Sequence, residues 1–374
     1  MSLTINPSLK NVPVYQPGRP IEEVARELGL DAEAIIKLAS NENPLGPSKL
    51  ALTAMRRAVS QAQLYPDGNA FYLKQKLAAK LGVTPANLIL GNGSNELLEF
   101  VGHALVAPGS EVVVSQYCFA VYPIITALFG GKLVVVPAKE LGHDLDAMLA
   151  AITPNTRVVF VANPNNPTGT VVTREALLAF INAVPETVAV VLDEAYLEFL
   201  ADPPDLLPEI LSGRKPNLLL CRTFSKIYGL AALRLGYGIG HPDLITELEK
   251  IRQPFNTNAI AQAGALAALD DTTHAERTRR NNARGLRAYA RAFRKLGLVS
   301  IPSSANFVLV RVGDGQRVFG EMQQRGVIVR PMGGYQLPEW IRISVGTPKE
   351  NQRCIEVLTQ ALGAASEPGL PPRT

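Results

Sequence analysis

The sequence predicts an α/β protein: a large domain with a mostly parallel sheet sandwiched by helices, plus a smaller α+β domain. Three observations lead to this prediction. Between residues 85 and 240, short apolar runs alternate with helical patterns, which is typical of βαβ units. The runs are almost continuously hydrophobic, as in strands that helices cover on both faces. After residue 240 the pattern changes to long helices followed by a few alternating strands.

The first region is expected to contain strands at residues 88–90, 111–115, 133–137, 158–162, 188–192 and 218–221. Helical patterns fill gaps between them at residues 95–106, 145–152 and 173–184. Thr173 is the expected N-cap of the last helix, because its hydroxyl can accept a hydrogen bond from an unpaired backbone N–H. The second region is expected to contain strands at residues 305–312, 326–330 and 340–345 and a closing helix at 349–364.

The chain is expected to divide into three parts, since its 374 residues allow two or three domains. Residues 1–45, rich in Pro and Asn, are expected to form an N-terminal arm that is part of the small domain. Residues 46–245 are expected to form the large domain, which binds the cofactor inferred below. Residues 246–374 are expected to form the small C-terminal domain.

Composition and charge favour small-molecule chemistry. Hydrophobic residues make up 47% of the chain and charged residues 19%, which is typical of a compact globular protein rather than a disordered or fibrous one. A formal net charge of +4 is too small to indicate a nucleic-acid partner without a focused basic patch. We find neither a secretory signal pattern nor an apolar run of ~18 residues, so we expect a cytoplasmic protein without a membrane partner.

Cysteine and histidine spacing argues against disulfides and metal sites. The three cysteines are odd in number and far apart, and none of the four histidines is close enough to another to form a ligand pair. We therefore expect no metal.

Five arginines at residues 280, 284, 287, 291 and 294 follow helical spacing and share one helix face. Charge runs on helices usually face solvent, so we interpret this face as solvated.

The segment after the strand expected at 218–221 is the most informative for function. Lys226 stands at this strand end beside Ser225, and Arg234 follows eight residues later. A lysine amine can form a Schiff base with an aldehyde, and an arginine supplies a fixed cation for a phosphate. This combination suggests pyridoxal phosphate, whereas a lone Ser-Lys pair would indicate only a surface loop.

Two upstream motifs strengthen this interpretation. Asp193 comes at the C-terminal end of the strand expected at 188–192, where open α/β sheets bind ligands. A carboxylate there can pair with a protonated pyridine nitrogen. Asn166 follows the strand expected at 158–162 and offers an amide at another strand end, although an Asn/Pro/Gly cluster alone is more often a plain turn.

The ordered set Asn166, Asp193, Tyr196, Ser225-Lys226 and Arg234 resembles the fold type I, aspartate-aminotransferase-like enzymes that use pyridoxal 5′-phosphate. Three more motifs are similar to those of histidinol-phosphate aminotransferases: LASNENPLGP at residues 38–47, LYPDG at 64–68 and GNGSNE at 91–96. The likeness covers almost the whole chain. It implies an enzyme of histidine biosynthesis that moves an amino group between L-histidinol phosphate and 2-oxoglutarate or glutamate.

The resemblance also implies roles for individual residues in the cofactor site. Lys226 is implied to form the Schiff base and carry the proton, Asp193 to pair with the pyridine nitrogen, and Tyr196, with Asn166, to hold the ring hydroxyl. Tyr117 is implied to stack on the ring, with core packing as its alternative role. The implied phosphate contacts are Gly93, Ser94, Thr223, Ser225 and Arg234.

For the substrate, the resemblance implies Arg342, whose guanidinium can grip a carboxylate with two hydrogen bonds. The other implied substrate contacts are Tyr15, Asn43, Asn306 and Arg330. Tyr65 resembles a tyrosine that reaches the neighbouring subunit's cofactor phosphate, which implies a homodimer with active sites at the interface. Tyr15 and Asn306 also have structural interpretations as hydrogen bonders, as does Tyr65 as a turn residue.

Three alternative functions stay open from the sequence. An aromatic amino-acid aminotransferase or a phosphothreonine decarboxylase differs from the main interpretation only in substrate. The third is a pyridoxal-phosphate-binding regulatory protein fused to a DNA-binding module. Only ~40 residues precede the motif at residues 40–43, which is short for a helix-turn-helix module with a linker, so we expect an enzyme.

Overall fold

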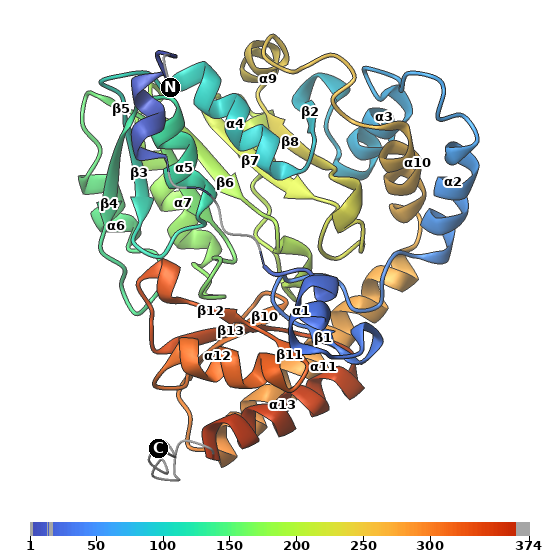
Figure 1. Ribbon diagram of the computed structural model, residues 1–374. Helices are drawn as coiled ribbons and strands as arrows, with labels where there is room; N and C mark the ends of the chain where they lie inside the picture. Colours follow the sequence, from blue (N-terminus) through green and yellow to red (C-terminus); the bar gives the residue numbers. More distant parts are fainter. Residues whose placement is uncertain (1–2, 13, 15–17, 364–374) are drawn as a thin grey trace.

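The computed structural model describes residues 3–12, 14 and 18–363. A seven-stranded sheet in the order β2-β8-β7-β6-β5-β3-β4 forms the centre of its larger part (Figure 1). The strands are β2 (Leu88–Gly91), β3 (Glu111–Ser115), β4 (Lys132–Val136), β5 (Thr156–Ala162), β6 (Ala189–Asp193), β7 (Leu218–Thr223) and β8 (Gly236–Gly240). Only the pairs that include β8 are antiparallel. The predicted fold class, a mostly parallel sheet between helices, is confirmed.

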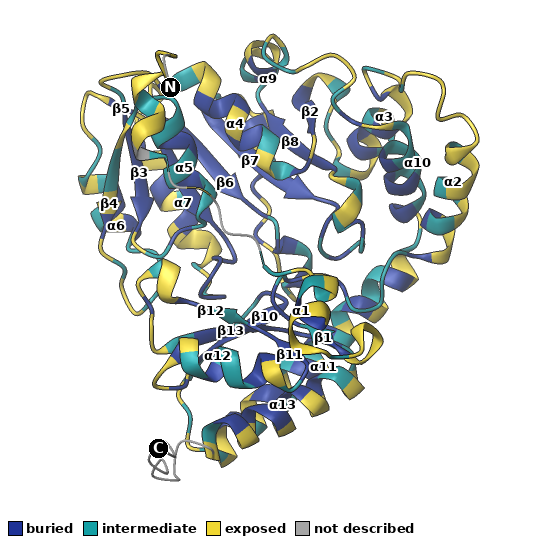
Figure 2. Ribbon diagram, in the orientation of Figure 1, coloured by how far each residue is buried: buried dark blue, intermediate teal, exposed yellow. Residues whose placement is uncertain are grey.

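Helices cover both faces of this sheet because alternate residues of each strand enter two separate cores. On β5, Val159 and Val161 belong to one apolar core, whereas Val158 and Phe160 belong to the other. Figure 2 shows the strands as almost entirely buried, except the edge strand β4, in which only Val136 is buried. The first core packs against α2 (Lys49–Val59), α3 (Phe71–Leu81), α6 (Leu145–Ala150), α7 (Arg174–Ala183), α8 (Leu207–Leu211) and α10 (Ala259–Ala268), and the second against α4 (Ser94–Leu105), α5 (Val121–Leu128) and α9 (Pro242–Glu249).

The smaller part is built on a four-stranded antiparallel sheet in the order β12-β13-β10-β9. Its strands are β9 (Ser300–Ile301), β10 (Phe307–Arg311), β12 (Arg330–Pro331) and β13 (Trp340–Ser344). Its helices are α11 (Thr272–Lys295), α12 (Gly315–Gln324) and α13 (Pro348–Gly363). Their apolar faces share one core with β10 and β13.

The described chain begins beside the larger part, where the 3₁₀ helix Pro7–Asn11 contacts α5, and α1 (Ile21–Leu28) and β1 (Ile36–Lys37) then lie against the smaller part (Figure 1). Strand β1 pairs in parallel with β11 (Val327–Ile328). Short 3₁₀ helices complete the fold at Pro7–Asn11, Ala32–Ala34, Pro85–Asn87, Leu197–Phe199, Ala231–Leu233 and Gly333–Tyr335.

The division of the chain into three domains remains a prediction, and packing favours moving its second boundary. Helix α9 spans residue 245 and α10 lies beyond it, yet both helices pack into the cores of the large sheet. The alanine-rich face of α10 contacts α2, so the polypeptide leaves the large sheet only near the start of α11. We therefore place the boundary near residue 271.

The arginine face lies on α11, and all five arginines are exposed, as expected. The opposite face of α11 is buried through Tyr289 and Phe293. Among the residues that the structure describes, no helix is long and apolar enough to cross a membrane.

Candidate active site

A cavity of about 410 Å³ opens where the carboxyl ends of the parallel strands face the smaller part of the chain. It brings together residues from the ends of β5, β6 and β7, from the start of α4 and from the N-terminal segment. The sequence-predicted residues on its wall are Ser94, Asn166, Asp193, Tyr196, Thr223, Ser225, Lys226, Arg234, Arg330 and Arg342. Strand polarity explains this gathering, since loops that follow parallel strands emerge at the same sheet edge.

Lys226 follows β7 after the turn Phe224-Ser225 and directs its amine into the cavity. Its Nζ lies 3.3 Å from the Ser40 carbonyl oxygen and 5.6 Å from the centre of the Tyr196 ring. Burial, followed by the positive charge of Arg342, lowers the pKa of Lys226 to about 8. Near neutral pH, the amine is therefore far easier to deprotonate than an ordinary lysine.

Asp193, the last residue of β6, is buried at the floor of the cavity. Its carboxylate accepts hydrogen bonds from the Tyr122 hydroxyl at 2.9 Å and from the Ala195 backbone N–H at 3.1 Å. Burial raises the pKa of Asp193, while these two hydrogen bonds oppose the rise. Tyr122 is itself held by stacking on Phe160, with ring centres 4.6 Å apart.

Asn166, Tyr196 and Arg342 all lie on the cavity wall, and hydrogen bonds fix each of them. Nη1 of Arg342 donates to Asn166 Oδ1 at 2.5 Å, and its Nη2 donates to the Ala39 carbonyl at 2.9 Å. The Tyr196 hydroxyl accepts a hydrogen bond from Asn41 Nδ2 at 2.9 Å. Burial raises the pKa of Tyr196 to about 12, so this hydroxyl stays protonated in the physiological range.

A cradle for an anion lies at the start of α4. Thr223 Oγ1 donates to Ser225 Oγ at 3.0 Å, and Arg234 Nη1 lies 3.4 Å from the same oxygen. Gly93 has a φ of +79°, and a Cβ there would lie 2.4 Å from Arg234 Nη2, so glycine leaves room for the guanidinium. The first N–H groups of a helix lack intrahelical partners and, with the helix dipole, favour an anion.

The structure places Phe119, and not Tyr117, on the cavity wall. Tyr117 packs beside the apolar cluster of Leu309, Met332 and Leu337. The two aromatic residues are two positions apart in the irregular segment after β3, where side-chain alternation no longer follows the strand. This placement favours Phe119 over Tyr117 as the candidate for the stacking ring.

Several predicted substrate residues lie away from the cavity wall. The Asn43 amide donates to the Ile227 carbonyl at 2.9 Å and to Thr278 Oγ1 at 3.2 Å, which ties the N-terminal segment to α11. The Asn306 amide donates to the Asn41 carbonyl at 2.9 Å, so it supports the segment that carries Asn41. Tyr15 lies outside the described residues. These contacts favour the structural interpretation for Asn306 and indicate a structural role for Asn43 as well.

Tyr65 is 83% exposed and stacks on Phe255, with ring centres 4.8 Å apart. It lies in the connection from α2 to α3, whereas the cavity wall of its own chain does not include it.

Sequence reasoning missed four residues of the site: Phe119, Asn41, Tyr122 and Tyr335. Asn41 lies inside the motif at residues 38–47 and could have been singled out there. Tyr122 gave a weaker signal, one of two hydroxyl side chains in a largely apolar helix. Tyr335 offered none, because its position depends on packing between the two parts of the chain. In the part of the chain that the structure describes, no group of three or more His, Cys, Asp or Glu side chains is placed to hold a metal.

Comparison with known proteins identifies the family. The family model described as "Aminotransferase class I and II" matches residues 33–358. A histidinol-phosphate aminotransferase of Akkermansia muciniphila is 55% identical over 93% of this chain and 96% of its own. Histidinol-phosphate aminotransferase 2 of Ralstonia nicotianae is 53% identical over 98% of this chain and 99% of its own.

A solved structure agrees with these relatives. The crystal structure of histidinol-phosphate aminotransferase from Sinorhizobium meliloti, in complex with pyridoxal-5′-phosphate, is similar with a TM-score of 0.90 and 32% sequence identity. The similarity covers 97% of this chain and 98% of that one. The chain therefore belongs to the class I and II aminotransferases and, within them, to the histidinol-phosphate aminotransferase family.

Proposed function

We propose that this protein is a pyridoxal-phosphate-dependent aminotransferase of histidine biosynthesis, which moves an amino group between L-histidinol phosphate and 2-oxoglutarate or glutamate. The observation that carries the proposal is a single cavity with three features: the amine of Lys226, the buried carboxylate of Asp193, and an arginine-lined anion cradle. Relatives with this name are about half identical to the chain over almost its full length.

The residues fit pyridoxal 5′-phosphate. The missing Cβ of Gly93 leaves room for Arg234 beside the N-terminus of α4, where a phosphate would be held together with Ser94 and Ser225. Asp193 would face the pyridine nitrogen, while Asn166 and Tyr196 would hold the ring hydroxyl. Phe119 would lie against the ring, and Lys226 would bind the aldehyde carbon.

When bound, the cofactor supplies a protonated ring that stabilises the electron pair left at the substrate Cα after proton loss. Asp193 would keep the ring nitrogen protonated, since a carboxylate there can pair with the ring N–H and this one is aligned by Tyr122 and Ala195. Lys226 would be the residue that takes the proton from the substrate Cα and carries it to the cofactor. Its lowered pKa suits this exchange, since a general base works best when its pKa lies near the operating pH.

Arg342 and Arg330 would bind the anionic ends of the substrates. A transaminase must accept two substrates in one site, and here both carry anions: a phosphate on histidinol phosphate and carboxylates on glutamate. A guanidinium accepts either anion, because its N–H groups form a planar fork. Arg342 is buried and oriented by Asn166 and Ala39, whereas Arg330 lies at the cavity edge and is less buried.

The proposal includes a homodimer that acts in the cytoplasm. Tyr65 is exposed and does not line the cavity of its own chain, as expected for a residue that reaches the cofactor phosphate of a neighbouring subunit. Large apolar side chains nearby are also exposed, and a partner subunit would cover them: Leu50, Leu64, Phe71 and Tyr72. The three cysteines are free thiols, which suits a reducing compartment.

A spectral titration tests the proposal. The purified protein with its cofactor would receive glutamate, L-histidinol phosphate, phenylalanine and phosphothreonine in separate samples, and the cofactor's visible absorption would be followed. We expect glutamate and histidinol phosphate to change the band. A response to phenylalanine in preference to histidinol phosphate would favour the aromatic aminotransferase, and carbon dioxide release from phosphothreonine would favour the decarboxylase. A wild-type protein that binds no cofactor would refute the proposal.

A further inference from the structure

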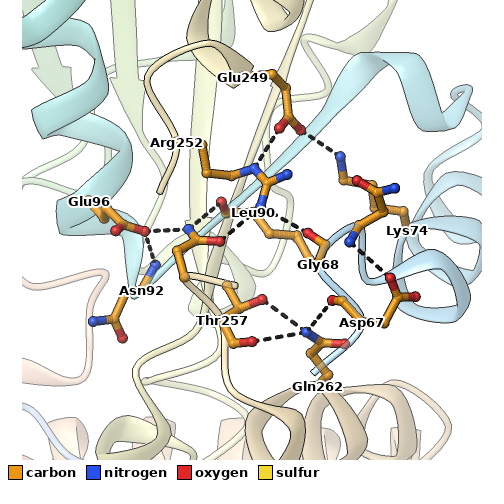
Figure 3. A network of polar contacts seen from close by, with 12 residues as sticks. Asp67, Gly68, Lys74, Leu90, Asn92, Glu96, Glu249, Arg252, Thr257 and Gln262 are labelled. Carbon is orange, nitrogen blue, oxygen red and sulfur yellow. Dashed lines mark hydrogen bonds and ion pairs between the residues drawn. The ribbon is translucent and has the colours of Figure 1, made fainter. Parts of the chain in front are cut away.

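The segment that joins α9 to α10 connects two separate loops of the proposed cofactor site (Figure 3). We call residues 252–257 the clasp. On one side, Arg252 Nη1 donates to the Gly68 carbonyl at 2.9 Å, in the loop at 65–70 that carries Tyr65. On the other side, Asn256 Nδ2 lies 3.2 Å from the Leu90 carbonyl, just before the phosphate turn at residues 91–94. The clasp therefore contacts both loops at once.

On the side of the phosphate turn, the contact runs through a shared carboxylate. Glu96 Oε2 accepts hydrogen bonds from the Asn92 backbone N–H and from Asn256 Nδ2, both at 2.6 Å. Hydrogen bonds to an ionised carboxylate are shorter and roughly twice as strong as neutral ones. Because Asn92 immediately precedes Gly93 and Ser94, Asn256 helps to fix the backbone that would face the phosphate.

On the side of the Tyr65 loop, Arg252 is the centre of the contacts. Its Nε donates to Glu249 Oε2 at 2.5 Å, and its Nη1 also donates to Asn256 Oδ1 at 3.1 Å. Lys74 Nζ binds the other oxygen of Glu249 at 2.7 Å. The arginine side chain is only 13% exposed, so solvent and salt screen these interactions less than those of a surface pair.

Two further contacts hold the same loop. The ring of Phe255, inside the clasp, stacks on Tyr65 at an interplanar angle of 23°. Gln262 Nε2 donates to the carbonyls of Asp67 and Thr257, each at 3.0 Å, and so joins the loop to the end of the clasp. The orientation of Tyr65 thus depends on the same six residues that brace the phosphate turn.

We propose that Arg252 and Asn256 are positioning residues for the cofactor phosphate, which hold the phosphate turn of one subunit and its Tyr65 loop in a fixed relation. The inference rests on the proposed function, since it takes Gly93, Ser94 and Tyr65 as phosphate contacts. Neither residue lies on the wall of the cavity, so both act through the backbone and side chains that they hold.

A positioning role for the phosphate can be distinguished from a general effect on the fold, because the residues proposed to contact the cofactor's ring lie outside the clasp. Lys226 and Asn166 follow β7 and β5, and Asp193 ends β6. The clasp makes none of the hydrogen bonds described for them. Loss of the clasp should weaken binding of pyridoxal 5′-phosphate but spare binding of pyridoxal, which has the ring and aldehyde without the phosphate. A general disturbance of the fold would weaken both.

The test compares dissociation constants of the two compounds for cofactor-free Asn256→Ala and Arg252→Met proteins. Each variant is titrated with each compound at constant salt, and binding is followed by the visible absorption of the bound compound. The melting temperature of each apoprotein is also recorded. Arg325→Met is the matched control, because Arg325 also bonds a carboxylate, that of Glu321, but lies in the smaller part, at the C-terminal end of α12. We expect at least fivefold weaker binding of pyridoxal 5′-phosphate, less than twofold change for pyridoxal, and no change in the control.

Equal weakening for both compounds, or unchanged binding of both, would overturn the inference. If Arg252→Met does not fold, Glu96→Gln replaces it, since it removes the carboxylate that joins Asn92 to Asn256 and keeps the side-chain shape. Failure of the wild-type protein to bind pyridoxal 5′-phosphate would instead contradict the proposed function, so the two failures are distinguishable.

Discussion

Replacement of Arg342 by lysine tests whether this side chain recognises the anion common to both substrates. The guanidinium is held from behind by Asn166 at 2.5 Å and by the Ala39 carbonyl at 2.9 Å, and it lies over the Phe307 ring at 5.1 Å. These contacts set the plane of the fork before a substrate arrives. A lysine ammonium keeps the charge, but it cannot hold both acceptors and also present two coplanar donors.

The expected loss is about one charge-assisted hydrogen bond to the substrate. Such a bond contributes ~1.5–3 kcal/mol, which corresponds to a decrease of about 10- to 150-fold in a second-order rate constant. The decrease should be similar for glutamate and for histidinol phosphate, because both present an anion to the same fork. The bound cofactor's absorption spectrum should remain that of the wild-type protein.

Single-turnover kinetics with each substrate, together with a melting curve, provide the assay. Arg311→Lys is the control, since Arg311 lies on the neighbouring strand β10 but is exposed and paired with Glu339. If Arg342→Lys lowers the melting temperature and leaves both half-reactions near wild type, Arg342 is a framework residue and the reasoning is refuted. Loss for one substrate alone would refute the shared-anion argument.

The remaining predictions concern the proton carrier, its partner and the dimer. Lys226→Ala should abolish turnover while the protein still folds and binds some cofactor; measurable steady-state transamination would contradict this role. Asp193→Asn should retain cofactor but slow proton removal severely, as deuterium exchange at the substrate Cα would report. Cofactor loading of the apoprotein should accelerate as pH rises through about 8, because Lys226 must lose its proton, and Arg342→Met should move this midpoint upward by removing a nearby positive charge. Tyr65→Phe should weaken cofactor binding in a dimer, whereas light scattering that shows an active monomer would exclude the shared site.

Much of the site could be predicted because its main residues follow strands. Asn166, Asp193 and Lys226 come just after the apolar runs that form β5, β6 and β7, and neighbouring parallel strands bring such positions to one edge. The runs themselves were recognisable, since strands buried on both faces are apolar at every position. Local sequence and one rule of topology were therefore sufficient for these three residues.

Residues that depend on long-range packing were not predictable in the same way. Arg342 bonds Asn166 across 176 positions of the sequence, and Asn306 bonds Asn41 across 265. The alanine-rich sequence of α10 likewise indicates a buried helix, but it does not indicate which of the two sheets the helix packs against. Whether Phe119 or Tyr117 faces the cavity depends on how an irregular segment turns, and no helical or strand periodicity predicts that turn. Local sequence therefore says least where geometry is set by contacts between distant segments or by an irregular turn.

The cations of the cavity serve two purposes that reinforce each other. Arg342 and Arg234 are placed to bind anions, and both also lower the pKa of Lys226, although burial has the larger effect. An enzyme that binds a phosphorylated cofactor and acidic substrates needs such positive charge, and the same charge favours the neutral amine that its chemistry requires. Asp193 and Glu42 act in the opposite direction, which keeps the pKa of Lys226 from falling further. Anion recognition and amine reactivity are therefore coupled in this site, so substitutions of its arginines affect both.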